Sequence, residues 1–246
     1  MTRIQVKADL ELDEPMLVEG LPGVGLVGKI ATDLLVDQFD MTYFASVDAE
    51  GIPQVAIYDE GERGVQPPVR IYADEDRDLL ALQSDVPVSR TAAADFADGV
   101  TNWLTDFGAT PVYLSGLPVE QSDAVPEVYG IATGNAAGVL DEHGVDTPPE
   151  RGVVGGPTGA LINRASETGL DSVGLVVESD PQFPDPAAAN QLIKDGIAPV
   201  VDVDVDTSEL TERAEEIREQ KEKLAQRMQQ ASEEESSQAQ PMRMFQ

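Results

Sequence analysis

The sequence predicts an α/β fold: a three-layer α/β/α sandwich on a mixed β-sheet, followed by a C-terminal helix and a disordered tail. Short apolar runs alternate with segments of helical periodicity over the first 200 residues, as in strands joined by crossover helices. Aromatic residues make up only 5% of the chain, so the core rests on aliphatic side chains. The stretch 54–83 has several strand-like runs and no room for crossover helices, which makes the sheet mixed.

The elements follow from apolar runs bounded by turn residues, taken in chain order. The predicted strands are 16–19, 42–47, 54–58, 69–72, 79–83, 110–115, 152–155 and 172–177, and the predicted helices are 24–39, 89–107, 158–167 and 186–197. Asp185 followed by Pro186 is a strong signal for a helix start, because Asp caps N-termini and Pro suits the first helical position. Residues 1–206 are therefore predicted to form one α/β domain.

The chain changes character after Pro199. Valine and aspartate alternate from Val201 to Asp206, which predicts a strand with a charged outer face. A polar helix over 207–231 follows, with a narrow apolar seam at Leu210, Ala214, Ile217, Lys221, Leu224, Met228 and Ala231. Such a seam needs a partner, either the domain or a second copy of the chain. Residues 232–246 have a disordered composition, yet they end on apolar residues.

The formal net charge of -30 arises from acidic residues spread along the whole chain. In molar salt the Debye length falls to about 3 Å, so this surface is screened and keeps the protein soluble. We interpret the charge as adaptation to a high-salt cytoplasm; the alternative, an acidic ligand for a basic partner, predicts clustered charge. The excess of carboxylates argues against nucleic-acid binding, which needs Lys and Arg at the phosphates.

Cysteine is absent, which excludes disulfides, a thiol nucleophile and Cys-based metal sites. The N-terminus does not resemble a signal peptide, and no apolar stretch approaches the roughly 20 residues that cross a bilayer. We therefore expect a cytoplasmic protein without a membrane span.

A glycine-rich segment at the junction of the first strand and first helix is the most conspicuous motif. It contains Gly20, Pro22, Gly23, Gly25 and Gly28. The last three glycines satisfy the dinucleotide-binding fingerprint, with Asp48 about 20 residues on. The segment also approaches a phosphate-binding loop, but Ile30 stands where Ser or Thr would bind magnesium. The alternative interpretation is a tight turn that starts the helix close to the sheet.

Other candidate sites lack the residues that their chemistry needs. Glu178 and Asp180 follow a buried strand as a possible carboxylate pair, without a partner motif. Asp202, Asp204 and Asp206 resemble the start of a calcium loop, but Thr207 and Arg213 replace the required Gly and Glu. Ser115 and His143 have no context as a catalytic pair, and His143 precedes a Gly as at a helix end. We therefore predict a protein-binding module with no catalytic residues, metal or cofactor.

Three segments together resemble the archaeal proteasome assembly chaperone family, also called PAC2-like. They are the glycine-rich segment from Leu17 to Gly28, the sequence from Gly156 to Leu161, and the Pro-Asp-Pro-Ala-Ala segment within residues 178–189. The resemblance spans most of residues 10–200. It implies a phosphorylase-like sandwich, a homo-oligomer, an architectural rather than nucleotide-binding glycine turn, and 20S proteasome α-subunits as partners.

The resemblance also implies a role for the last residues. Some archaeal members carry a C-terminal hydrophobic-Tyr-any motif that enters pockets between neighbouring α-subunits. Met244, Phe245 and Gln246 are similar to that motif, with Phe in place of Tyr. The ring keeps its apolar contact and loses the hydroxyl hydrogen bond, which favours docking over gate opening. The main hypothesis is therefore a non-enzymatic proteasome assembly chaperone or activator, and the alternative is a nucleotide-binding protein or enzyme that uses the Gly23, Gly25 and Gly28 loop.

Overall fold

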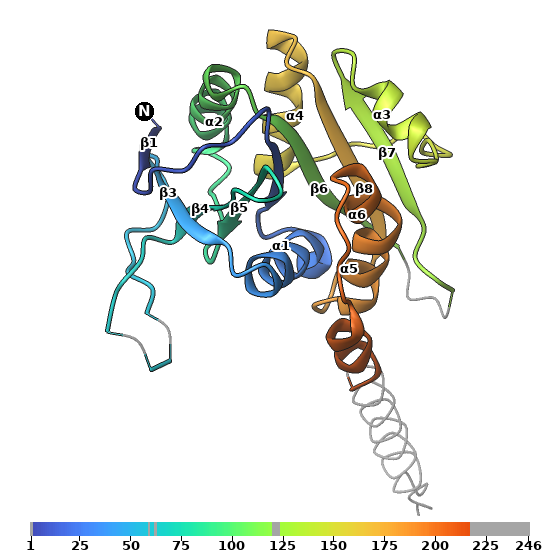
Figure 1. Ribbon diagram of the computed structural model, residues 1–246. Helices are drawn as coiled ribbons and strands as arrows, with labels where there is room; N and C mark the ends of the chain where they lie inside the picture. The colour runs from blue at the N-terminus through green and yellow to red at the C-terminus, as the bar shows by residue number, and fades with distance from the viewer. Residues whose placement is uncertain (1, 59, 62, 120–123, 217–246) are drawn as a thin grey trace, which may run out of the picture.

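An eight-stranded mixed sheet forms the centre of the computed structural model, which describes residues 2–216 except 59, 62 and 120–123. Four parallel strands lie in the middle of the sheet, in the order β5 (Leu79–Ser84), β2 (Met16–Gly20), β6 (Thr110–Pro118) and β8 (Ser172–Ser179). These strands are almost continuously apolar, because helices cover both of their faces (Figure 1).

Antiparallel strands extend the sheet on both sides. One side carries β4 (Val69–Asp74), β3 (Thr42–Asp48) and the edge strand β1 (Arg3–Val6), and the other carries β7 (Val128–Thr133). The full order is β1-β3-β4-β5-β2-β6-β8-β7. The predicted mixed sheet and α/β class are therefore confirmed.

Two helical layers complete the sandwich. On one face, α1 (Val27–Gln38), α5 (Pro186–Leu192) and the short segments η2 (Ile193–Ile197) and α6 (Ala198–Val200) pack on the sheet. On the other face lie α2 (Ala93–Phe107) and α4 (Gly156–Thr168), which pack against each other. Each face has its own core of aliphatic side chains, with Leu35 and Leu192 in one and Leu104 and Leu161 in the other.

Two of the eight predicted domain strands are wrong, and four elements were not predicted, among them the three-residue α6. Residues 54–58 form only a single bridge, between Ile57 and Gln66, within the long loop between β3 and β4. Residues 152–155 are coil beside the glycine at which α4 begins. The other missed elements are β1, β7 and α3 (Ala137–Glu142). Gly130 lies within β7, where a Cβ would be 2.7 Å from the side chain of Leu140 in α3.

The alternation of valine and aspartate over 201–206 places the valines inward without forming a strand. Val203 and Val205 pack against the core while the three aspartates are exposed, and no described strand pairs with them. Residues 208–216 are helical, and Leu210, the first residue of the predicted seam, is buried in the domain core. The rest of the predicted helix and tail lies outside the described residues.

One edge of the sheet collects most of the long loops. The parallel strands β2, β5, β6 and β8 end there, and the register places the start of β4 and β7 at the same edge. β3 ends there too, because it runs antiparallel to β4. We call this side the carboxyl edge. None of the described helices is long and apolar enough to cross a membrane.

Candidate functional site

The glycine-rich segment leaves β2 at the carboxyl edge and turns into α1. Gly25 has a φ of 61° and Leu26 a φ of 53°, so two successive residues adopt the left-handed conformation. Glycine tolerates this conformation at no steric cost, whereas a residue with a Cβ pays about 1–2 kcal/mol. The turn is therefore tight enough to bring the helix start onto the sheet.

The protein itself fills the space around Gly25. A Cβ at this position would lie 1.9 Å from Ser179 Oγ at the end of β8. The Asp185 backbone N–H donates to the Gly25 carbonyl at 2.8 Å, and the Ser179 hydroxyl donates to the Asp185 carboxylate at 3.1 Å. Asp185 also accepts from the Ala188 N–H at 3.0 Å and so caps α5 as predicted. The turn and the start of α5 hold each other in place.

Gly28 brings α1 close to two strands. A Cβ here would lie 3.3 Å from the Leu114 Cβ of β6 and 3.5 Å from the Glu19 carbonyl of β2. Gly20 has a similar role, because a Cβ there would overlap the side chain of Thr32 in α1. The glycines thus permit close packing of the helix on the sheet.

Lys29, at the position of a phosphate-loop lysine, already has two protein partners. Its Nζ lies 2.7 Å from Asp33 and 3.1 Å from Asp85. Asp85 in turn pairs at 2.6 Å with Arg70, which is nearly buried and donates to Gln83 at 2.9 Å. This network ties α1 to β4 and β5. A nucleotide would have to break it to recruit the lysine, which argues against the nucleotide-binding alternative.

Glu19 is the most strongly perturbed acid at the carboxyl edge, and it is completely buried. Its carboxylate accepts from the backbone N–H groups of Leu21 at 3.1 Å and Leu114 at 3.2 Å, and from the Thr158 hydroxyl at 3.0 Å. Burial raises the pKa of Glu19 to about 8, against the lowering effect of these three donors. The side chain joins β2, β6 and α4, but it has no solvent access from which to act on a substrate.

The remaining acidic and hydroxyl candidates serve the local backbone. Glu178 accepts from the Glu127 N–H at 3.3 Å, and Asp180 accepts from the Gln182 N–H at 2.8 Å. His143 forms the C-cap of α3, followed by Gly144 at a φ of 68°, as the sequence predicted. Across the described part of the chain, no group of three metal-ligating side chains is close enough to hold an ion.

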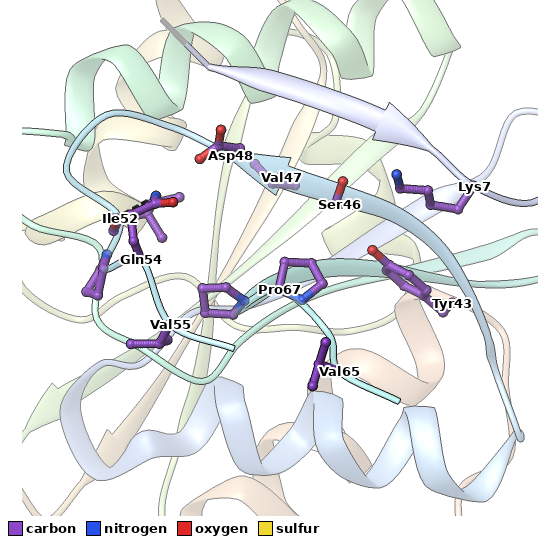
Figure 2. Close-up of a pocket in the computed structure, with 12 residues that line it drawn as sticks. Lys7, Tyr43, Ser46, Val47, Asp48, Ile52, Gln54, Val55, Val65 and Pro67 are labelled. Atoms are coloured by element: carbon purple, nitrogen blue, oxygen red, sulfur yellow. Dashed lines mark hydrogen bonds between the residues drawn. The ribbon is translucent and has the colours of Figure 1, made fainter. Parts of the chain in front are cut away.

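A pocket of about 460 Å³ lies along β3, between this strand and the loop 49–68 that leaves β3 at the carboxyl edge (Figure 2). Tyr43 and Ser46 of β3 form one wall, and Val55 and Val65 of the loop form another. Lys7 lines the pocket, with its ammonium group donating to Gln5 at 2.7 Å. The sequence has one signal for this site. The Gly and Pro residues between 51 and 68 indicate a long loop, although a strand was predicted within it at 54–58.

The other predicted site residues are placed as follows. Gly20 packs against α1, Gly25 against the β8–α5 junction and Gly28 against β6. Gly23 is exposed, and Pro22 is half-buried. Met244, Phe245 and Gln246 lie outside the described residues. The carboxyl edge therefore offers a packed glycine turn, a buried acid and an open pocket lined partly by apolar side chains, and none of these is an assembled catalytic centre.

Comparison with known proteins gives a family match and close structural matches. The model of the PAC2 family matches residues 17–225. Two uncharacterized proteins of Methanocaldococcus jannaschii are similar in sequence. One is 30% identical over 191 residues, which cover 76% of each chain, and the other is 27% identical over 212 residues, 84% of this chain and 81% of the relative.

Two crystal structures from Pyrococcus furiosus share the fold. PbaA, described as an archaeal homolog of proteasome-assembly chaperone, matches with a TM-score of 0.78 and 28% identity, over 94% of this chain and 100% of that one. PbaB, described as an archaeal proteasome activator, also matches with a TM-score of 0.78, at 22% identity over 91% of this chain and 98% of that one. At that lower identity, the likeness to PbaB concerns the fold alone.

Proposed function

The chain belongs to the PAC2 family, and on that premise we propose that it is a non-enzymatic proteasome assembly chaperone or activator that binds the α-ring of the 20S proteasome in the cytoplasm. The observation that carries the proposal is the match to PbaA, which extends over nearly the whole of both chains. The geometry of the carboxyl edge supports it, because Glu19 is sealed from solvent and Lys29 is engaged by two carboxylates. A protein that acts by binding does not require a free carboxyl group at Glu19 or a free ammonium group at Lys29.

We further propose that Met244, Phe245 and Gln246 dock into pockets between neighbouring α-subunits. An aromatic ring flanked by an apolar side chain is a compact anchor with a low entropic cost of ordering. A terminal carboxylate adds a charge for a lysine of the pocket. One such anchor binds weakly, so the proposal includes a homo-oligomer, in which several tails engage a ring of repeated pockets and gain affinity through effective concentration.

The charge distribution along the sequence is consistent with a domain that presents the tail and a tail that docks. Within residues 217–246 the basic and acidic residues balance, namely Arg218, Lys221, Lys223, Arg227 and Arg243 against Glu219, Glu222, Glu233, Glu234 and Glu235. The formal net charge of -30 therefore resides entirely in residues 1–216. A neutral segment can approach an acidic partner protein without the repulsion that the domain meets at low salt.

Co-sedimentation with purified 20S particles in molar KCl tests the proposal. The full chain is compared with a chain that lacks the last three residues and with the variant Phe245→Ala. We expect the full chain to sediment with the particles and both altered chains to bind at least tenfold more weakly, because each loses the anchor. Equal binding by all three would refute tail docking, and no binding by the full chain would refute the proposed function itself.

A further inference from the structure

The exposed large hydrophobic side chains of the described residues gather at the carboxyl edge. Seven of them lie in segments that connect strands and helices at this edge, namely Leu26, Val55, Tyr58, Val65, Val125, Val153 and Phe183. Six of these residues follow a strand that ends at the edge or precede one that begins there. Val153 precedes α4, whose Thr158 reaches Glu19 at the end of β2. Only Val6, on the edge strand β1, lies elsewhere.

The loop 49–68 contributes three of these side chains and the pocket beneath them. Tyr58 is 77% exposed and Val65 is 69% exposed, although the rest of the surface is dominated by carboxylates. Loops of this length without regular structure are uncommon in compact domains, and they are usually either functional or disordered. Apolar groups exposed next to one another on a soluble protein mark a contact surface.

Among the described helices, α1 packs on β2, β5 and β6, and none packs on the face of β3 that lines the pocket. Tyr43 and Ser46 of β3 form one wall, and Val55 and Val65 of the loop form another (Figure 2). The result is a hollow with an apolar rim, the form in which an interface receives an anchoring side chain.

We propose that the pocket and its rim residues Val55, Tyr58 and Val65 form a second contact with the proteasome α-ring, which receives an apolar side chain that projects from the ring. This inference rests on the proposed function and adds a body surface to the tail contact. A small molecule in the pocket would leave the outward-facing Tyr58 uncovered, whereas a protein surface would cover pocket and rim together.

The direction of the chain indicates why the ring is the occupant. Residues 208–216 leave the body on the same side as the loop 49–68 (Figure 1). Thirty residues follow Glu216; with the predicted helix up to residue 231 and the last fifteen residues extended, they reach about 75 Å. The domain can therefore rest with its carboxyl edge against the ring while the last residues occupy a pocket. Once the tail is docked, the loop contact forms at high effective concentration and needs little intrinsic affinity.

The test separates the two contacts. The triple variant Val55→Ser, Tyr58→Ser, Val65→Ser is made in the full chain and in the chain lacking Met244–Gln246, with Val6→Ser as a matched control that is also exposed. Each is co-sedimented with purified 20S particles in molar KCl. We expect the triple variant to bind about tenfold more weakly in both backgrounds, and Val6→Ser to bind like the parent chain.

The substituted side chains are exposed, so the thermal unfolding of the triple variant is expected to match that of the parent chain and to exclude misfolding. Unchanged binding by the triple variant, with normal binding by the full chain, overturns this inference and leaves the proposed function standing. A change in the mass of the free triple variant by sedimentation velocity also overturns it, because the surface then joins copies of this chain. Absence of binding by the full chain overturns both proposals.

Discussion

The buried carboxyl of Glu19 makes the stability of the protein depend on pH in a direction opposite to that of most acidic residues. Its pKa is raised from 4.5 to about 8 by burial. Between these two values the native state binds the proton more tightly than the unfolded state does. Stability from this group is therefore fully present below pH 4.5 and is lost as the pH rises towards 8.

The magnitude follows from the shift. At about 1.4 kcal/mol per pKa unit, the change from 4.5 to about 8 amounts to about 5 kcal/mol. Glu19 is 0% exposed, so solvent screening does not reduce this figure. A loss of that size is comparable to a large part of the stability of an ordinary domain. The protein should become markedly easier to unfold between pH 6 and pH 8.

The assay is urea unfolding at constant molar KCl across pH 5 to 9, on the parent chain and on Glu19→Gln. The amide cannot titrate, and it places a donor against the Leu114 N–H, which costs about 1–3 kcal/mol at every pH. The parent chain therefore starts more stable. The difference shrinks, and then reverses, by about 1.4 kcal/mol per pH unit between pH 5 and pH 8, and it levels off above pH 8. Parallel curves for the two proteins would refute the reasoning.

Three further predictions follow from the carboxyl edge. Gly25→Ala lowers the free energy of unfolding by about 3 kcal/mol, because backbone strain at φ 61° adds to the overlap with Ser179. The control Gly108→Ala, at φ 78° with open space around it, lowers it by only about 1 kcal/mol. Equal losses for the two variants in urea unfolding would contradict this packing. Asp185→Ala lowers it by about 1–2 kcal/mol through loss of the α5 cap, and Asp185→Asn recovers part of that loss; an unchanged denaturation midpoint for the Ala variant would exclude the cap. ATP, GTP, NAD and NADP leave the thermal unfolding midpoint unchanged, because the glycine turn is packed and Lys29 is paired; a rise of several degrees with any of them would revive the nucleotide-binding alternative.

The parts of the fold that were predictable are those with strong local patterns. The central strands β2, β5, β6 and β8 could be recognised from sequence because they are apolar runs. Helix α5 could be recognised because it begins with Asp-Pro. β7 could not, because Gly130 weakens its strand pattern and is explained only by Leu140 from another element. Residues 54–58 are a strand-like apolar run, but in the structure they form only a single bridge, between Ile57 and Gln66.

The candidate site was partly predictable for a similar reason. The glycines of the turn were visible in the sequence, but the group that occupies the space around Gly25 is Ser179, more than 150 residues away. The burial of Glu19 depends on contacts from β6 and α4 that no local pattern reveals. The pocket beside β3 lies on a strand face that no described helix covers, which is a property of the sheet order rather than of any segment.

Affinity capture from the cytosol of the source cell tests the central claim most directly. The full chain is tagged at its N-terminus, so that Gln246 remains the last residue, and captured in molar KCl, with mass spectrometry to quantify the bound proteins. The account predicts that α-subunits of the 20S proteasome are the most enriched proteins, and that their enrichment falls when Met244, Phe245 and Gln246 are removed. Recovery of the full chain with no enrichment of proteasome subunits would contradict it.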